Sequence, residues 1–341
     1  MERSRVTIDL GALRRNVRTL LGILAGAELW AVVKADGYGH GAVDVGRAAL
    51  EAGAGALCVA TVAEGVALRR ALPEPRVLVL GPTDDDDVGT AHEARLELTV
   101  AADGRVPEGL PIHLKLDTGM GRWGLAELPA NASRNVVGVM SHLASADCDD
   151  AFTGAQVERF LTATAALGSI TRHLANSAAA IRFPASRLDA ARCGIALYGL
   201  SPFGEDPRTD GLVPVLSWRS AVRQVKLLRA GESTGYGRRF VASADTWIGI
   251  VPVGYADGFR RDMTGTSVLL DGERRRVVGT VSMDALAVEL PERLAVGTPV
   301  TLVGDGLLLE EHARVADTIT YELACRLQAD PTRALREVLN G

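Results

Sequence analysis

The chain has 341 residues, of which 47% are hydrophobic and 23% charged, and its formal net charge is −5. This length favours two domains over one, and the composition is that of a globular protein with a sizeable core. A mildly acidic balance argues against nucleic acid or an anionic membrane surface as the main partner.

The N-terminus and the cysteines indicate the compartment in which the protein works. The opening segment, MERSRVTIDLGALRRNV, lacks the apolar core of a signal peptide, and no run of about 18 apolar residues occurs in the chain. The cysteines are far apart and form no C-x-x-C pair, so neither a zinc site nor a redox motif is spelled out. Four consecutive aspartates, Asp84 to Asp87, are interpreted as a solvated loop or helix start. We expect a cytoplasmic protein without a metal site.

Short apolar runs alternate with amphipathic segments, such as residues 42–51 and 63–70, over about the first 200 residues. This alternation is the pattern of βα units that form a parallel sheet. In chain order the runs are residues 29–34, 56–60, 76–80, 96–100, 111–116, 136–140, 172–175 and 187–191. Eight such units favour a closed (β/α)8 barrel of the TIM type. An open doubly wound sheet is also compatible with the periodicity, because a sequence pattern does not show whether a sheet closes.

After Gly211 the sequence becomes rich in β-like segments. They are SWRSAVRQVKLL, TWIGIVPV, SVLLDGERRRVVGTVSMDALAVEL and GTPVTLVG, with turn residues between them. A connector rich in Pro, Asp and Gly, residues 201–214, precedes this change. We therefore predict a barrel domain over residues 1–212 and a mostly β domain over residues 213–341.

Polar residues lie where the predicted barrel strands end, and barrels build their sites at the C-terminal ends of their strands. Lys34 ends the first run, Lys115 stands near the end of the fifth, and Ser141-His142 follows the sixth. Asn176-Ser177 follows the seventh run, and Arg192-Cys193-Gly194 follows the eighth. A Ser and a Gly after the last two strands match the common phosphate site of barrels. An amine together with a phosphate cradle is what pyridoxal 5′-phosphate (PLP) requires.

Each of these residues has a purely structural alternative when it is considered alone. A lysine at a strand end is usually a side chain that reaches out to solvent. A single histidine such as His142 is more often a hydrogen-bonded structural residue, and Asn176-Ser177 alone is more often a helix cap. The functional interpretation depends on the combination, because independent structural roles would not all fall at one end of a barrel.

Short motifs between residues 31 and 285 carry a more specific likeness. In chain order they are AVVKADGYGHG, HLKLDTGMGRWG, SHLASAD, HLANSAA, ARCGIALYG, VPVGYADG and VSMDA, with a weaker match, TITYE, at residues 318–322. On these motifs the chain resembles the alanine racemases, PLP-dependent enzymes of fold type III. The resemblance implies an N-terminal barrel, a C-terminal β domain and a head-to-tail homodimer whose active sites draw on both subunits. It also implies interconversion of L-alanine and D-alanine, which supplies D-alanine for peptidoglycan synthesis.

The resemblance assigns catalytic and substrate-binding roles to residues at matching positions. Lys34 and Tyr255 are implied as the two bases that act on the external aldimine, with the tyrosine coming from the second subunit. One base on each face is needed, because racemisation removes a proton from one face of Cα and returns it to the other. Arg122 and the backbone N–H of Met283 are implied to bind the substrate carboxylate. The supporting residues are Lys115, which is carbamylated in many relatives, and Asp284.

The resemblance also implies a set of cofactor-binding residues. Arg192 is expected to face the pyridine nitrogen, and His142 to back that arginine in a hydrogen-bond network. The cofactor phosphate is expected to lie among residues that follow the first, seventh and eighth strands and one in the C-terminal domain. The full implied set is Lys34, Tyr38, His142, Asn176, Ser177, Arg192, Gly194, Ile195 and Tyr321.

Three departures from the family pattern are visible. Ala285 follows Met-Asp where many relatives have Gln, residues 329–333 (Ala-Asp-Pro-Thr-Arg) replace the usual Arg-Val-Pro-Arg, and the connector is short. The alternatives that stay open are a racemase for another or broader set of amino acids such as serine, and a PLP-dependent decarboxylase of the same fold. A non-catalytic PLP-binding protein is a third. The tyrosine in GYADG argues against the last two.

Overall fold

The computed structural model describes residues 3–102, 107–129, 134–327 and 330–341. The chain divides into two compact units. The barrel unit comprises residues 13–203 and 208–213. The β unit comprises the described residues up to Ala12, together with residues 204–207 and 214–341.

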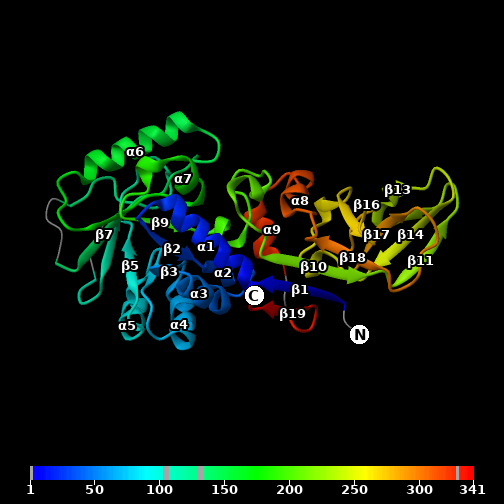
Figure 1. The fold of residues 1–341 in the computed structure, drawn as a ribbon, viewed down its shortest axis with the longest axis horizontal. Coiled ribbons are helices and arrows are strands. Elements are labelled where there is room, and N and C mark those ends of the chain that lie inside the picture. Colours follow the sequence, from blue (N-terminus) through cyan, green and yellow to red (C-terminus); the bar gives the residue numbers. More distant parts are fainter. Residues whose placement is uncertain (1–2, 103–106, 130–133, 328–329) are drawn as a thin grey trace. The chain divides into compact units, whose positions relative to one another are not determined.

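The barrel unit contains eight parallel strands that close into a barrel, with helices outside the strands (Figure 1). Each strand pairs with its neighbour in the sequence, and closure is made by β2 and β9, where Trp30 pairs with Arg192. This closure confirms the TIM-type barrel and excludes the open sheet. The strands are β2 (Glu28–Val32), β3 (Ala56–Val59), β4 (Val77–Val79), β5 (Glu97–Val100), β6 (Ile112–Lys115), β7 (Val136–Met140), β8 (Thr171–His173) and β9 (Ala190–Cys193).

Several helices begin at residues that cap them. Thr61 and Glu64 form a reciprocal capping box at the start of α4, and Asp149 and Asn176 cap α6 and α7. The four aspartates stand at the start of α5, where negative charge suits the helix dipole. The helices are α1 (Leu10–Leu24), α2 (Lys34–Tyr38), α3 (Ala42–Glu51), α4 (Val62–Ala71), α5 (Asp85–Glu93), α6 (Asp150–Thr164) and α7 (Ser177–Arg182), with 3-10 turns η1 (Pro184–Ser186), η2 (Ile195–Tyr198) and η3 (Pro207–Asp210).

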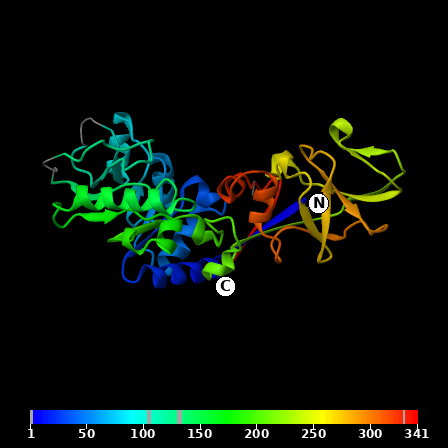
Figure 2. The same cartoon turned by 90° about the horizontal axis from the view of Figure 1, so that it is seen from above.

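The β unit is built on a nine-stranded sheet with the order β11-β14-β17-β16-β15-β18-β10-β1-β19, and it carries a separate pair, β12-β13 (Figures 1 and 2). Its strands are β1 (Ser4–Asp9), β10 (Leu216–Ala221), β11 (Gln224–Leu228), β12 (Ser233–Thr234), β13 (Phe240–Val241), β14 (Thr246–Val251), β15 (Ser267–Leu270), β16 (Glu273–Val278), β17 (Leu286–Leu290), β18 (Pro299–Val303) and β19 (Leu335–Leu339). Its helical segments are η4 (Tyr236–Arg238), η5 (Tyr255–Asp257), η6 (Arg261–Met263), α8 (Leu309–Val315) and α9 (Thr320–Arg326).

The first strand belongs to the β unit rather than to the barrel. Thr7 of β1 pairs with Ser217 of antiparallel β10 and with Glu337 of parallel β19. A linear division at residues 212 and 213 assigns β1 to the barrel, and the structure differs on this point. The reason is that backbone pairing joins β1 to strands that follow it much later in the chain.

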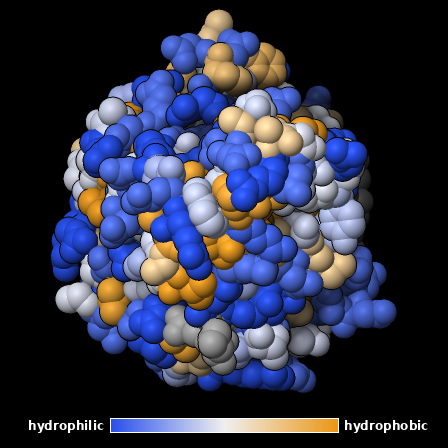
Figure 3. Space-filling view, turned by 90° about the vertical axis from the view of Figure 1, so that its right-hand side faces the viewer, coloured by the Kyte–Doolittle hydropathy of each residue, from blue (hydrophilic) through white to orange (hydrophobic). Residues whose placement is uncertain are grey.

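Large apolar side chains fill both units. Trp30 and Phe160 are fully buried in the barrel unit, and Trp218 and Phe259 lie 6.2 Å apart (ring centroids) in the β unit. The face shown in Figure 3 is mostly hydrophilic, with apolar residues in small groups. None of the helices in the described ranges is both long and apolar enough to cross a membrane.

Candidate functional site

The structure brings the predicted barrel residues to the rim where the strands end. Lys34 begins α2 just after β2, Lys115 is the last residue of β6, and His142 follows β7. Ser177 begins α7 after β8, and Arg192 lies in β9, two residues before Gly194. All the strands of a parallel barrel end on the same side, so these side chains share one rim.

Lys34 opens an unusual left-handed turn. The φ angles of Ala35, Asp36, Gly37 and Tyr38 are 52°, 51°, 61° and 53°. This conformation costs a non-glycine residue about 1–2 kcal/mol. Hydrogen bonds hold the turn: Ala35 N donates to Glu64 Oε1 at 2.8 Å, and Gly37 N donates to the Val33 oxygen at 2.8 Å. The glycines predicted a tight turn here, but non-glycine residues with positive φ were not anticipated. Such strain is typical of functional sites.

Tyr38, Ser177 and Gly194 together form a cradle with the composition of a phosphate site. The Ser177 Oγ accepts hydrogen bonds from Gly194 N at 3.0 Å and from Ala196 N at 3.4 Å. A Cβ at Gly194 would lie 2.5 Å from the Tyr38 hydroxyl, so only glycine leaves that hydroxyl its place. The two hydroxyls, of Tyr38 and Ser177, are suitable donors for a phosphate, and these residues therefore fit PLP.

A Gly194→Ala substitution is expected to weaken PLP binding, because the new methyl group displaces the Tyr38 hydroxyl from the cradle. We expect the dissociation constant for PLP to rise about tenfold or more, which corresponds to about 1.4 kcal/mol. Titration of the cofactor-free protein by absorbance measures this change. Gly154→Ala in α6 is the matched control, because a Cβ there meets nothing within 4 Å. Equal affinities in the two variants would contradict the assignment.

The remaining rim residues are mainly cationic. Burial, followed by the charges of Arg192, Lys115, Arg122 and Lys34, holds the pKa of His142 well below its usual value, so the imidazole is neutral. Burial and the Arg122 charge also lower the pKa of Lys115 to about 8. The rim therefore attracts anions such as a phosphate or a carboxylate.

The loop that carries Arg122 is held by Asp117. The Asp117 carboxylate accepts backbone hydrogen bonds from Gly119, Met120 and Gly121 at 2.8–3.2 Å. Trp123 lies beside two cations: the Lys115 Nζ is 5.7 Å and the Arg122 guanidinium carbon 5.3 Å from its ring centroid. Arg122 itself is exposed.

Arg192 is buried and bound to uncharged acceptors. Its Nη1 donates to His173 Nδ1 at 2.8 Å and to the His173 carbonyl at 2.7 Å. Its Nη2 donates to the carbonyl of Ser141 at 2.6 Å and to that of Leu174 at 3.2 Å. Burial lowers the pKa of Arg192 to about 10, but this value is still high enough for the guanidinium to be charged at neutral pH. The sequence interpretation missed His173, although it stands in the HLANSAA motif.

The other predicted residues lie in the β unit. Tyr255 in η5 is 41% exposed and Met283 is 53% exposed. The structure brings their two loops together: Tyr255 N donates to the Ser282 oxygen at 3.1 Å, and Ala256 N donates to the Met283 oxygen at 3.1 Å. Tyr321 lies in α9 of the same unit. Asn176, by contrast, uses its Oδ1 to cap α7.

Arg333 connects the two loops of the β unit, and the sequence interpretation did not assign it a role. Its Nε donates to Asp257 Oδ1 at 2.8 Å, and its Nη2 donates to Asp284 Oδ1 at 2.7 Å. Asp257 is almost fully buried and also lies 3.5 Å from Arg3 Nη2. Of the unusual segment 329–333, Ala329 lies outside the described residues, but Arg333 keeps an arginine at its end.

An Arg333→Met substitution is expected to loosen the loops that carry Tyr255 and Met283. Because Asp257 then loses its nearer arginine and keeps the more distant Arg3 and the backbone N–H of Gly254, we expect a loss of about 1–3 kcal/mol in unfolding free energy. Urea unfolding and turnover measure the two effects, and kcat should fall. The control is Arg275→Met, which removes an exposed ion pair with Glu273. Matching behaviour of the two variants would show that Arg333 does not position these loops.

A (β/α)8 barrel with a lysine and an anion cradle on one rim, followed by a β unit, is typical of one class of PLP enzymes. Family models for the alanine racemase N-terminal and C-terminal domains match residues 8–202 and 215–335. The chain is 39% identical to the alanine racemase of Levilactobacillus brevis over 98% of both chains. The chain belongs to the alanine racemase family, whose members are PLP-dependent isomerases.

Solved structures give the same result. The crystal structure of alanine racemase from the D-cycloserine producer Streptomyces lavendulae superposes with a TM-score of 0.92 at 34% identity, covering 100% of this chain and 98% of that one. The alanine racemase of E. faecalis superposes with a TM-score of 0.90 at 36% identity, covering 99% and 98%. The alternatives of a decarboxylase or a non-catalytic binding protein are not favoured.

Proposed function

We propose that the protein interconverts L-alanine and D-alanine with Lys34 and Tyr255 as the two bases. PLP, when bound, withdraws electrons from Cα of the amino acid and makes its proton removable. Lys34 holds the cofactor and serves the D enantiomer, while Tyr255 serves the L enantiomer. Arg122 and the Met283 backbone bind the substrate carboxylate, and Asp284 steadies the Met283 loop. The observation that carries this proposal is Lys34 on the rim beside the cradle of Tyr38, Ser177 and Gly194.

We also propose a head-to-tail homodimer in which each active site takes Tyr255 and Met283 from the second copy. Tyr255 and Met283 are both exposed in the single chain. This supports the arrangement, because residues that serve the active site of a second copy must be accessible to it. We also propose a division of roles at residues 212 and 213: the cofactor lysine, Lys34, lies before this boundary, and Tyr255 and Met283 lie after it. Work in the cytoplasm, with D-alanine passing to peptidoglycan synthesis, is the physiological role that the family suggests.

Racemisation of alanine tests the proposal directly. Purified protein with PLP is incubated with L-alanine in heavy water, and optical rotation and Cα exchange are followed. We expect both to proceed, and absence of exchange would reject the proposal. Parallel incubations with serine and other amino acids measure how specific the enzyme is for alanine.

Lys115 is expected to react with carbon dioxide to form a carbamate. With a pKa of about 8, a much larger fraction of its amine is neutral near pH 8 than for an ordinary lysine, and only the neutral amine attacks carbon dioxide. The carbamate would place a negative charge among Arg122, Arg192 and Lys34. Below this pKa, the neutral fraction of the Lys115 amine falls about tenfold for each further unit of pH.

NMR with labelled bicarbonate measures the carbamate. We expect a carbamate signal near pH 8 that is lost on acidification to about pH 6. The Lys115→Gln variant should lack this signal at every pH. A signal that persists in this variant would place the reactive amine elsewhere.

A further inference from the structure

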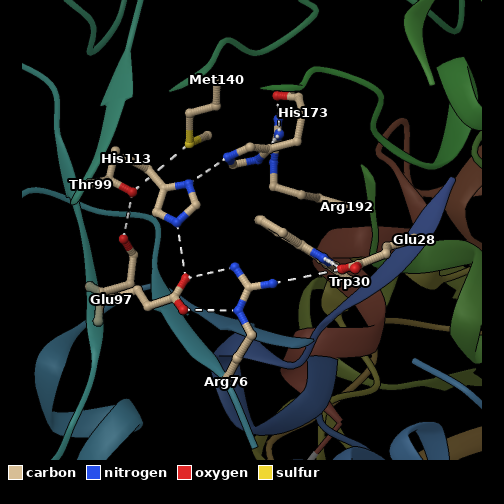
Figure 4. A network of polar contacts seen from close by, with 10 residues as sticks. Glu28, Trp30, Arg76, Glu97, Thr99, His113, Met140, His173 and Arg192 are labelled. Atoms are coloured by element: carbon tan, nitrogen blue, oxygen red, sulfur yellow. Dashed lines mark hydrogen bonds and ion pairs between the residues drawn. The ribbon is translucent and has the colours of Figure 1, made fainter. Parts of the chain in front are cut away.

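Behind Arg192, buried polar side chains form a chain of hydrogen bonds through the barrel interior (Figure 4). Nε2 of His173 in β8 lies 2.8 Å from Nδ1 of His113 in β6. Nε2 of His113 lies 2.9 Å from Oε2 of Glu97 in β5. Arg76 donates to both Glu97 oxygens, at 2.9 and 3.2 Å. The chain of contacts therefore joins Arg192, at the rim, to a carboxylate on another side of the barrel.

The partners at the two ends determine which ring nitrogens carry protons. A guanidinium only donates, so His173 Nδ1 must accept from Arg192, and the His173 proton lies on Nε2. That N–H donates to His113 Nδ1, which leaves the His113 proton on Nε2, where it donates to Glu97. Every donor thus points from Arg192 towards Glu97. The opposite tautomers would set an N–H of His173 against an N–H of Arg192.

This arrangement requires both histidines to be neutral, and the lowered pKa values of both rings are consistent with that. Burial lowers the pKa of His113, and burial with the nearby Arg192 holds the pKa of His173 well below its usual value. Although burial alone would raise it, hydrogen bonds from His113 and Arg76 lower the pKa of Glu97 to about 2. On its other side, Arg76 Nη1 lies 3.8 Å from the carboxylate of Glu28.

Gly138 in β7 leaves the space that the two histidines need. A Cβ at this position would lie 2.1 Å from His113 Nδ1, the atom that accepts from His173. The φ angle of Gly138 is not positive, so the position needs glycine because it has no side chain and not because of its backbone conformation. A glycine inside a strand is a known sign of such close approach.

We propose that Glu97 is a remote positioning residue for racemisation: through His113 it fixes the tautomer of His173 that accepts the hydrogen bond of Arg192. The proposal rests on the role given above to Arg192 beside the pyridine nitrogen. A carboxylate directly against Arg192 would compete with that nitrogen for the guanidinium protons. Two neutral imidazoles keep the negative charge at a distance and still orient the guanidinium.

The Glu97→Gln variant tests the proposal. Because Arg76 only donates, it draws the carbonyl oxygen of the new amide to itself, and the amide N–H then faces His113 Nε2. Both histidine tautomers reverse, and Arg192 loses its ring acceptor. In holoenzyme with nitrogen-labelled histidine, we expect NMR to show both protons on Nδ1. We expect kcat to fall about tenfold while KM changes less than about twofold.

A second substitution supplies a rescue. In Arg76→Met with Glu97→Gln, the amide is released from Arg76, so its carbonyl oxygen turns back to accept from His113. The original tautomers and most of kcat should return. Glu93→Gln, an exposed carboxylate at the end of α5, is the matched control and should change neither quantity. Gly138→Ala breaks the contact between the histidines without altering charge and should also lower kcat.

Unchanged tautomers in Glu97→Gln would overturn the proposal, as would reversed tautomers with an unchanged kcat. If Glu97→Gln does not fold, the comparison moves to Gly138→Ala, where a broken contact between the histidines with full kcat would overturn it equally. The imidazole spectra do not depend on turnover. Absence of racemisation in the parent enzyme would therefore reject the proposed function and leave the hydrogen-bond chain to be judged by its own spectra.

Discussion

Replacement of Lys34 by alanine is expected to abolish racemisation of both alanine enantiomers and covalent retention of PLP. Removal of a general base alone lowers rates by about 10²–10⁴-fold, and this variant also loses the amine that holds the cofactor. Chiral chromatography measures the first effect, and the absorbance of protein dialysed after exposure to PLP measures the second.

The lysine content of the chain makes this result easy to interpret. The sequence contains three lysines, Lys34, Lys115 and Lys226, so few side chains compete for the cofactor. Lys226→Ala, at an exposed position of β11, is the control and should keep full activity. Retention of PLP or racemisation in Lys34→Ala would show that the attachment site is wrong.

A Tyr255→Phe substitution is expected to separate proton exchange from racemisation. The equilibrium constant of racemisation is one, so kcat/KM must fall equally from both enantiomers, by about 10²–10⁴-fold. Cα exchange in heavy water should behave differently. D-alanine keeps its exchange because Lys34 removes and returns a proton on one face, whereas L-alanine loses it. Mass spectrometry of each enantiomer measures the label.

The hydroxyl of Tyr236 provides the matching control for this variant. Tyr236 is 71% exposed in η4 of the same unit, and Tyr236→Phe should leave exchange from both enantiomers intact. Equal loss of exchange from L-alanine and D-alanine in Tyr255→Phe would refute the assignment of one base to each face.

The barrel could be predicted from the sequence because each of its strands is encoded by a short stretch of consecutive residues. Each buried strand is a short apolar run, and runs such as 136–140 coincide with the strand itself. The last run was placed too early, at 187–191, whereas β9 spans Ala190–Cys193. Leu188 has a φ of 50°, which no extended strand adopts, so the apolar pattern there begins before the strand does.

The rim was also predictable, because the position at which a strand ends decides which residues reach it. The contacts of Arg192 were not predictable. Arg192 contacts the ring of His173, and the hydrogen bonds continue to His113 and Glu97. These residues lie on three different strands, and closure of the barrel decides which of their side chains meet in the interior. Sequence order carries no direct sign of which side chains meet inside a closed barrel. The same holds for Arg333, whose partners lie far away in the chain.

The position of β1 has a consequence for synthesis on the ribosome. β1 precedes the barrel strands in the chain, whereas its partners β10 and β19 follow them. The barrel strands, which pair with sequence neighbours, are complete before then. Vectorial synthesis therefore leaves β1 without these partners while the barrel assembles, and an unpaired strand is prone to intermolecular pairing. The nascent chain thus depends on β10 and β19 to cover the two edges of β1.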